Sequence, residues 1–257
     1  MKILFDNAAT RATISSTNEN ANYPASNLID EFLRIRWQEY HTGSVITIEF
    51  DDPEDIDCVF WSYSNAENIV VFTDTGAGAS EGAYGIELTS SGDYLTTSDG
   101  YMVGIVPASD GASAVYFDSV QTGVTHLYIW IYGEADKTYL GGIGCGLSTT
   151  LYPVVDYKEG YEDNSIIASS PYGQVAQNYI DPLVVDSYNF VGVNRETLID
   201  IRDKYKTVGV GGKVWVDLTS EKHEFKTPMY AVISAPFQSA PMGNGKYSFS
   251  LSFTEAR

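Results

Sequence analysis

Alternating apolar and polar residues mark several short segments of the chain as β-strands. Between positions 46 and 50, isoleucine and phenylalanine alternate with threonine and glutamate, which is typical of a strand with one buried face. An acidic turn at 51–55 follows, and then a strand at 56–63 that is apolar on both faces. Gly, Asp and Ser clusters separate further expected strands at 68–73, 84–89, 101–106, 114–120 and 126–132. Many short strands with this punctuation predict a sandwich or jelly roll.

The second half of the chain combines strands with one helix. Asn194 is a suitable N-cap, and the apolar residues Leu198, Ile201 and Tyr205 follow at helical spacing, which predicts a helix near 195–207 that Gly209 ends. Gly243-Asn244-Gly245 is a strong hairpin signal. Strands are expected at 174–185, 188–193, 213–218, 229–237 and 247–254.

The residue composition of the chain changes near its middle. The first domain closes in a glycine-rich strand at 139–147, and a polar, irregular stretch at 156–173 connects it to the second. We therefore expect a mainly β protein with two domains. Residues 1–150 form an N-terminal β-sandwich, and residues 151–257 form an α+β domain of β-sandwich type with one helix.

Charge narrows the classes of partner. Acidic residues outnumber basic ones 34 to 15, for a net charge of −19. Nucleic-acid binders and proteins that dock on anionic membranes need a basic surface, so neither class is expected. Since the start of the sequence at Met1 lacks a leader pattern and no apolar run reaches about 20 residues, the protein is expected to start soluble in a cytoplasm.

Residues that could carry catalysis do not form a pattern. His41, His126 and His223 are not at metal-ligand spacing, and His126 in a strand is expected to be structural. Cys58 and Cys145 are expected to be buried free thiols, with a disulfide left open. Acidic pairs such as 55/57 lie in turns and are expected to be solvated; an Asp-rich loop could hold Ca²⁺, but without an EF-hand pattern no cofactor is expected. The glycines at 141–144 lack the following helix that a phosphate loop needs. The chain is not expected to be an enzyme.

Aromatic residues near loops and strand ends of the first half offer a binding chemistry. Exposed rings can stack on sugars or anchor protein interfaces, although most such rings pack in cores. The residues we single out as candidate glycan contacts are Trp37, Tyr40, Trp61 and Tyr63.

Two short segments resemble a known type of protein. Residues 22–30 (NYPASNLID), an Arg/Trp segment and the strand at 45–50 (VITIEF) resemble the opening of galactose-binding-like, or discoidin-like, jelly rolls. A variant in phage genomes continues through a Gly-Ile-Gly segment, here 142–144, and a Ser-x-Tyr-Gly-type segment, here 170–173. It then has a helix and a closing strand, which is 249–255 (FSLSFTE) in this chain.

The resemblance implies a virion structural protein of a tailed bacteriophage, of the distal-tail type, made in the host cytoplasm. The second domain would form a homo-oligomeric ring, a hexamer or trimer, that joins the tail tube to the hub or baseplate. The first domain would decorate the outside of the tail. The alternative hypothesis is a carbohydrate-binding module for host-surface attachment. An unrecognised hydrolase is the least favoured hypothesis.

Overall fold

The computed structural model describes residues 1–18, 20–29, 36–39, 43–62, 64–66, 68–74, 95–96, 102–107, 112–132, 138–152, 157–162, 166–169, 175–178, 183–217 and 228–256. The fold is mainly β with antiparallel sheets and, in these ranges, one α-helix, as predicted. The expected strand at 84–89 lies outside the described residues. No helix in the described ranges is long and apolar enough to cross a membrane.

The chain divides into two compact units. Unit 1 comprises Met1–Thr150, Trp215–Tyr230 and Arg257, and unit 2 comprises Leu151–Val214 and Ala231–Ala256. The continuous part of unit 1 ends where the sequence places the domain boundary. The segment 215–230, which we expected in the second domain, belongs instead to unit 1.

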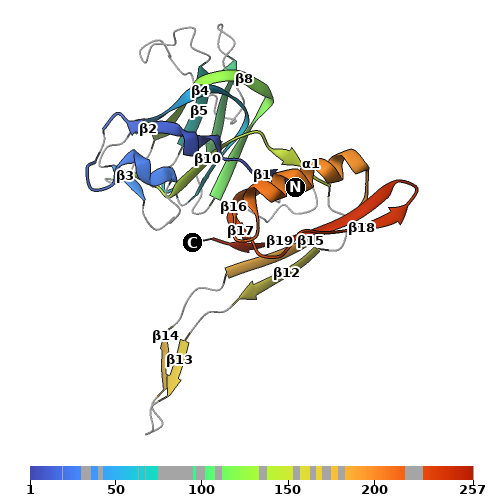
Figure 1. Ribbon diagram of the computed structural model, residues 1–257. Helices are drawn as coiled ribbons and strands as arrows, with labels where there is room; N and C mark the ends of the chain where they lie inside the picture. The colour runs from blue at the N-terminus through green and yellow to red at the C-terminus, as the bar shows by residue number, and fades with distance from the viewer. Residues whose placement is uncertain are drawn as a thin grey trace. The chain divides into compact units, whose positions relative to one another are not determined.

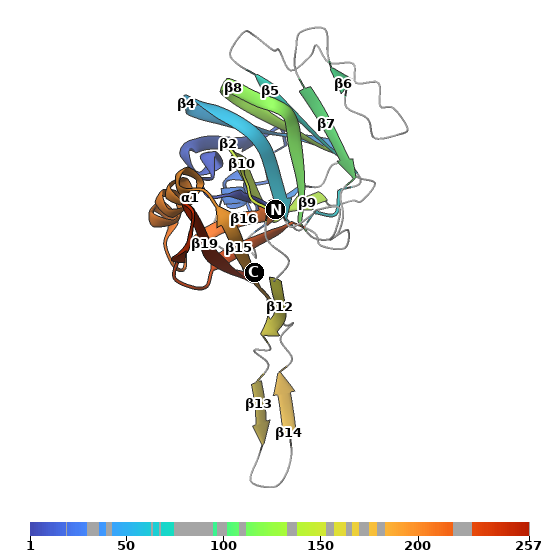
Figure 2. The same ribbon diagram turned by 90° about the vertical axis from the view of Figure 1, so that its right-hand side faces the viewer.

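Unit 1 is a β-sandwich made by two long bent strands. It contains β1 (Lys2–Leu4), β2 (Ala12–Ser16), β3 (Trp37–Glu39), β4 (Gly43–Ser62), β5 (Asn68–Asp74), β6 (Leu95–Thr96), β7 (Met102–Pro107), β8 (Ala112–Tyr132), β9 (Thr138–Leu140), β10 (Gly142–Gly146), β11 (Thr149–Thr150), two 3₁₀ turns, η1 (Ala8–Arg11) and η2 (Ala25–Ile29), and most of β16 (Lys213–Asp217). β4 and β8 curve together along their length (Figures 1 and 2).

The bend corrects two sequence predictions. Residues 51–55 do not form a turn but continue β4, and the strands expected at 114–120 and 126–132 are one strand, β8. Register shifts in the β4–β8 pairing fall between Glu49 and Cys58, and such irregularities increase bending. The first half of β4 pairs with β2 and its second half pairs with β10. The bend thus folds one sheet into two layers. In the sequence, the pattern of apolar and polar residues does not distinguish a bent strand from two strands joined by a hairpin turn.

The main core lies between these layers. Both halves of β4 and β8 contribute to it, through Ile46, Ile48, Ile129 and Val115 among others. The segment 22–30 also closes this core, because η2 buries Ala25 and Leu28 in it. The side chain of Asn27 donates from Nδ2 to the carbonyl oxygen of Arg36 at 3.0 Å, so the residues that carry the jelly-roll resemblance have a local packing role.

A second core explains why residues 215–230 belong to unit 1. The other face of the β4–β10 layer carries Cys58 and Phe60, which pack with Leu4 and Trp215. β1 pairs with both β11 and β16, which brings the Trp215 ring to 5.8 Å from that of Phe60. The Trp215 ring lies so close to Gly144 that a Cβ there would overlap the ring at Nε1 and Cδ1. The glycine at position 144 of β10 therefore leaves the room that the indole ring of Trp215 occupies.

Unit 2 is an antiparallel sheet with one helix on it. It contains β12 (Tyr157–Glu162), β13 (Ile166–Ser169), β14 (Val175–Asn178), β15 (Leu183–Val193), α1 (Arg195–Val208), β18 (Gln238–Gly243), β19 (Lys246–Glu255) and part of β17 (Met229–Ile233). β19 lies between β15 on one side and β17 and β18 on the other. Of the strand expected at 174–185, the structure describes β14 up to Asn178 and β15 from Leu183, and residues 179–182 lie outside the described residues.

The helix of unit 2 follows its sequence signals closely. The side chain of Asn194 accepts a hydrogen bond from the backbone N–H of Thr197 at 2.8 Å, and Gly209 ends the helix with a φ of 75°. Leu198 and Ile201 are buried, and Tyr205 packs on Phe237 at a centroid distance of 5.4 Å. The helix prediction at 195–207 is confirmed.

Candidate functional site

The aromatic residues predicted to contact a glycan do not form an exposed surface. Trp37 and Trp61 are both 0% exposed, and Trp61 lies in the main core of unit 1. The indole Nε1 of Trp37 donates to Ser16 Oγ at 3.3 Å. A ring enclosed by a core cannot stack on a sugar from solution, which corrects these two candidates to core residues. Tyr40 and Tyr63 lie outside the described residues.

The structure instead presents aromatic residues on the outward face of β8. Leu127, Ile129 and Ile131 point into the main core, so strand alternation puts the residues between them on the opposite face. We call His126, Tyr128 and Trp130 the aromatic column. Tyr128 and Trp130 are half-buried, and the His126 side chain is 32% exposed.

The residues beside the aromatic column follow from the strand registers. β8 lies between β4 and β5, and each ring has one neighbour on either strand. The three rows of this face, written from β4 through β8 to β5, are Glu49–His126–Asp74, Thr47–Tyr128–Phe72 and Val45–Trp130–Val70. The face therefore combines a central line of rings with a polar end.

The rings of the column are ordered by mutual contacts. The rings of His126 and Tyr128 are 6.0 Å apart and only 6° from parallel. Trp130 makes an edge contact with Phe72 at 5.1 Å and 83°. The β5 side of the face is buried, with Phe72 at 6% exposure, whereas the Glu49 side chain on β4 is 64% exposed. The column is thus approachable from the β4 side.

The sequence contained the signal for this column, because every second residue of 126–130 is aromatic. We expected a structural role for His126 and did not single out Tyr128 or Trp130. Which face of the strand points inward depends on the partners of β8, and these are distant in sequence.

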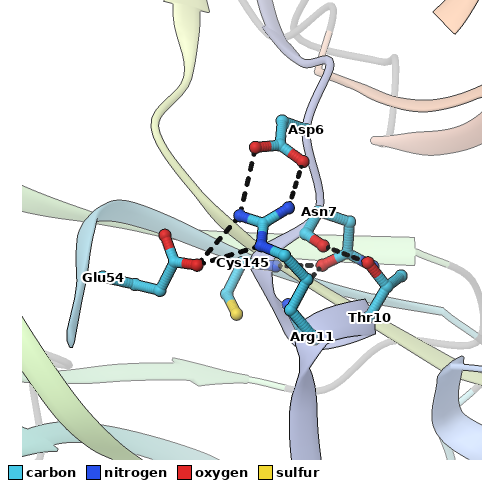
Figure 3. Close-up of polar contacts among 7 residues, drawn as sticks. Asp6, Asn7, Thr10, Arg11, Glu54 and Cys145 are labelled. Carbon is cyan, nitrogen blue, oxygen red and sulfur yellow. Dashed lines mark hydrogen bonds and ion pairs between the residues drawn. The ribbon is translucent and has the colours of Figure 1, made fainter. Parts of the chain in front are cut away.

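The polar side chains around Arg11 form a cluster that holds neighbouring segments of unit 1 together and is not a binding site. Its guanidinium donates to both carboxylate oxygens of Asp6, at 2.6 and 3.1 Å, and through Nε to Glu54 at 3.0 Å (Figure 3). Hydrogen bonding to Asp6 is the main cause that raises the pKa of Arg11. All three side chains are partly exposed, so these ion pairs contribute little to stability.

Asn7 carries the internal part of this anchor. Its Oδ1 accepts from the backbone N–H groups of Ala9 and Cys145, and its Nδ2 donates to the carbonyl oxygen of Ile143. These contacts fasten η1 to β10 (Figure 3). Both the oxygen and the nitrogen of the Asn7 amide hold backbone groups, so the role of the cluster is structural.

The two cysteines lie on opposite faces of one layer. Cys145 is opposite Val59 in the β10–β4 pairing and points into the main core, whereas Cys58 is opposite Gly146 and points into the second core. Both thiols are free, which answers the disulfide question left open by the sequence. Burial raises the pKa of Cys145 to about 12 and that of Cys58 well above its usual range. Neutral, enclosed thiols are poor nucleophiles.

Asp55 and Asp57 lie in β4 and not in a solvated turn as expected, and both accept hydrogen bonds. Asp57 accepts from the N–H and the hydroxyl of Ser148 at 2.7 and 2.9 Å, and Asp55 accepts from the N–H of Gly123 at 3.0 Å. Among the described residues, no group of three or more His, Cys, Asp or Glu side chains is placed to hold a metal ion.

Unit 2 offers a different kind of surface, namely the edges of its sheet. Within the described part of the chain, β12 has one strand neighbour, β15, and β18 has one, β19. Every residue of β18 is exposed. The pairing of β13 with β14 runs in nearly the same register as that of β12 with β15. The β13–β14 pair is therefore nested in sequence between the paired strands β12 and β15.

Comparison with known proteins gives a likeness of fold for about half of the chain. No family model matches, and no curated protein matches. A GH29 fucosidase of Ruminococcus gnavus is similar at 14% identity with a TM-score of 0.44, over 56% of this chain and 27% of the fucosidase. The chain thus corresponds to only about a quarter of that enzyme.

Two single-domain structures are similar to the same extent. One is the chitosan-binding module 1 of a chitosanase/glucanase from Paenibacillus, at 15% identity and a TM-score of 0.41, over 55% of this chain and 98% of the module. The other is an F5/8 type C domain from Bacteroides fragilis, at 10% identity and a TM-score of 0.41, over 53% of this chain and 91% of the domain.

Proposed function

We propose that this chain is a non-catalytic structural subunit of a bacteriophage tail, of the distal-tail type, in which unit 2 makes the subunit contacts and unit 1 is a recognition domain. The observation that carries the assembly role is the pair of sheet edges in unit 2, β12 and β18, that have no further strand neighbour among the described residues. The resemblance of segments 22–30 and 249–255 to phage proteins supports the placement in a tail. The second of these segments is the central strand β19.

Open edges suit a ring because strands can pair across subunits. The outer strand of a sheet presents unpaired N–H and C=O groups that template another strand. When the β12 edge of one copy meets the β18 edge of the next, the contact is heterologous, and such contacts close into a ring when the rotation permits. A hexamer or trimer is the ring we expect, in contact with the tail tube and the hub or baseplate.

The charge of the chain also fits passage of DNA. With a net charge of −19, a ring of this protein would repel a polyanion and let it slide without sticking. The outward face of β19 is lined by Ser248, Ser250, Ser252 and Thr254, which are uncharged and small.

Two measurements test the assembly role. Mass spectrometry of purified particles of the encoding phage should find the chain in stoichiometric amounts. Negative-stain microscopy of the concentrated full-length protein should find closed rings, which Tyr161→Lys abolishes by adding a charge to the exposed β12 edge. Tyr152→Lys is the matched control, because Tyr152 is 83% exposed and lies outside any strand. A chain that is absent from particles and monomeric at every concentration would overturn the proposal.

A second candidate function is saccharide recognition during host attachment, and the aromatic column favours it. A line of rings on an outward strand face is a surface on which pyranose rings can stack. This function is compatible with a tail location. Full-length protein should then bind immobilised host-surface glycans saturably, and a null glycan array together with normal adsorption of phage that lack the column would reject it.

A further inference from the structure

We infer that the aromatic column is a binding site for saccharides that are neutral or carry free amino groups, and that it disfavours acidic sugars. The inference rests on the second candidate function and names its site and ligand class. The ring spacing carries the first step. His126 and Tyr128 stack on each other, with their planes within 6° of parallel and their centroids 6.0 Å apart, so they form one ordered pair of rings against which a sugar can pack.

Burial determines the side from which a ligand approaches. Val70 and Phe72 on β5 are 0% and 6% exposed, whereas Tyr128 is half-buried and Glu49 is largely exposed. A saccharide would therefore rest on the rings and extend over β4. There Thr47, opposite Tyr128, and Glu49, opposite His126, offer a hydroxyl and a carboxylate to the hydroxyl groups of the sugar.

Charge selects among saccharides. The nine residues of the three rows include the carboxylates of Glu49 on β4 and Asp74 on β5, and the imidazole of His126 on β8, but no lysine or arginine. His126 Nε2 lies 4.0 Å from Glu49 Oε1. Acidic sugars lack the basic partner that a carboxylate requires, whereas the ammonium of a hexosamine can pair with Glu49.

Isothermal titration of the full-length protein at pH 7 tests the site. The probes are tetrasaccharides of equal length made of glucosamine, N-acetylglucosamine or galacturonate. We expect the first two to bind, with glucosamine preferred, and galacturonate to show no heat of binding. Higher salt should reduce the preference for glucosamine and leave binding of the neutral probe unchanged.

Variants separate stacking from charge. His126→Ala and Tyr128→Ala should each weaken binding of both sugars about three- to ten-fold, the range of one aromatic contact. Tyr152→Ala removes an exposed ring elsewhere and should change nothing. Glu49→Gln should lower only the preference for glucosamine, by about two- to five-fold, and Asp118→Asn, an exposed carboxylate elsewhere on β8, should not.

Because Tyr128 packs on Val70 and Phe72, its variant needs a thermal melt, and His126→Ala at the exposed end serves as the second variant. Unchanged binding in both variants would place the saccharide site elsewhere and overturn the inference. If the wild-type protein binds neither sugar yet is present in phage particles, the inference fails while the tail role stands, and the glycan array then decides the second function separately. Preferential binding of galacturonate would also overturn the inference.

Discussion

The central strands of the two units, β8 and β19, use alternation in the same way but expose different chemistry. In unit 1, β8 alternates buried aliphatic residues with aromatic ones. In unit 2, β19 alternates Phe249, Leu251 and Phe253, which are buried, with serine and threonine. The inward residues of both strands are buried apolar side chains, so it is the outward residues that distinguish the two units. Rings suit ligand stacking, whereas hydroxyl groups leave a small, uncharged face.

The units differ also in continuity. Unit 1 draws Trp215–Tyr230 from late in the chain, and its second core depends on that segment. A core that needs a segment distant in sequence is disrupted when that segment is removed. The inward and outward faces of a strand can instead be compared by single substitutions. The following experiments test these differences, from the largest expected effect to the smallest.

A chain consisting of residues 1–150 should fail to unfold cooperatively. It lacks Trp215, which stacks on Phe60, and Asp217, which accepts the hydroxyl hydrogen bond of Tyr116 at 2.6 Å. The loss leaves the buried face of the β4–β10 layer open to water. Chemical denaturation followed by circular dichroism measures this, with the full-length chain as control. A sharp two-state transition in the truncated chain would show that unit 1 is continuous after all.

Phe249→Ala should lower the free energy of unfolding by about 3–5 kcal/mol, the usual cost of truncating a buried phenylalanine. The Phe249 ring is 3% exposed and stacks on Phe190 at 4.6 Å. Its neighbour on the other face gives the control, because Ser250→Ala should change stability by less than about 0.5 kcal/mol. Equal effects in urea denaturation would contradict the assignment of inward and outward faces on β19.

Gly144→Ala should destabilise the protein by about 1–3 kcal/mol, since the added methyl group must displace the Trp215 ring from its packed position. Gly160→Ala is the matched strand control in unit 2, because a Cβ there comes no nearer than 3.8 Å to a neighbour. Thermal unfolding of both variants compares them. Similar melting temperatures for the two would mean that the indole ring has room to move.

Cys58 and Cys145 should not react with iodoacetamide at pH 8 in the native protein, and both should react after unfolding. Burial raises the pKa of both thiols, so the thiolate is scarce at this pH. Because the folded pKa of Cys145 lies above that of the unfolded chain, stability should fall as the pH rises from about 9 towards 12. Mass spectrometry counts the alkylated residues. Rapid native labelling of either thiol would contradict its burial.

Local signals account for the parts of the fold that were predicted well. The helix begins at its asparagine cap and ends at Gly209, and Asn244 and Gly245 adopt φ values of 52° and 70° in the β18–β19 hairpin, as that dipeptide favours. The polar stretch at 156–173 was wrong as a connection, because it contains β12 and β13. β12 is a strand because it pairs with β15, and β13 because it pairs with β14, and the composition of 156–173 does not show either pairing.

The sequence by itself determined that the protein is mainly β and that one helix follows Asn194, because both features depend on residues that are close in sequence. Tertiary structure decided that β4 and β8 bend through apparent turns, that Trp37 and Trp61 are enclosed, and that residues 215–230 complete unit 1. It also decided which side of β8 faces outward. The reason is physical: alternation defines two faces of a strand, but only the packing of distant strands determines which face is buried.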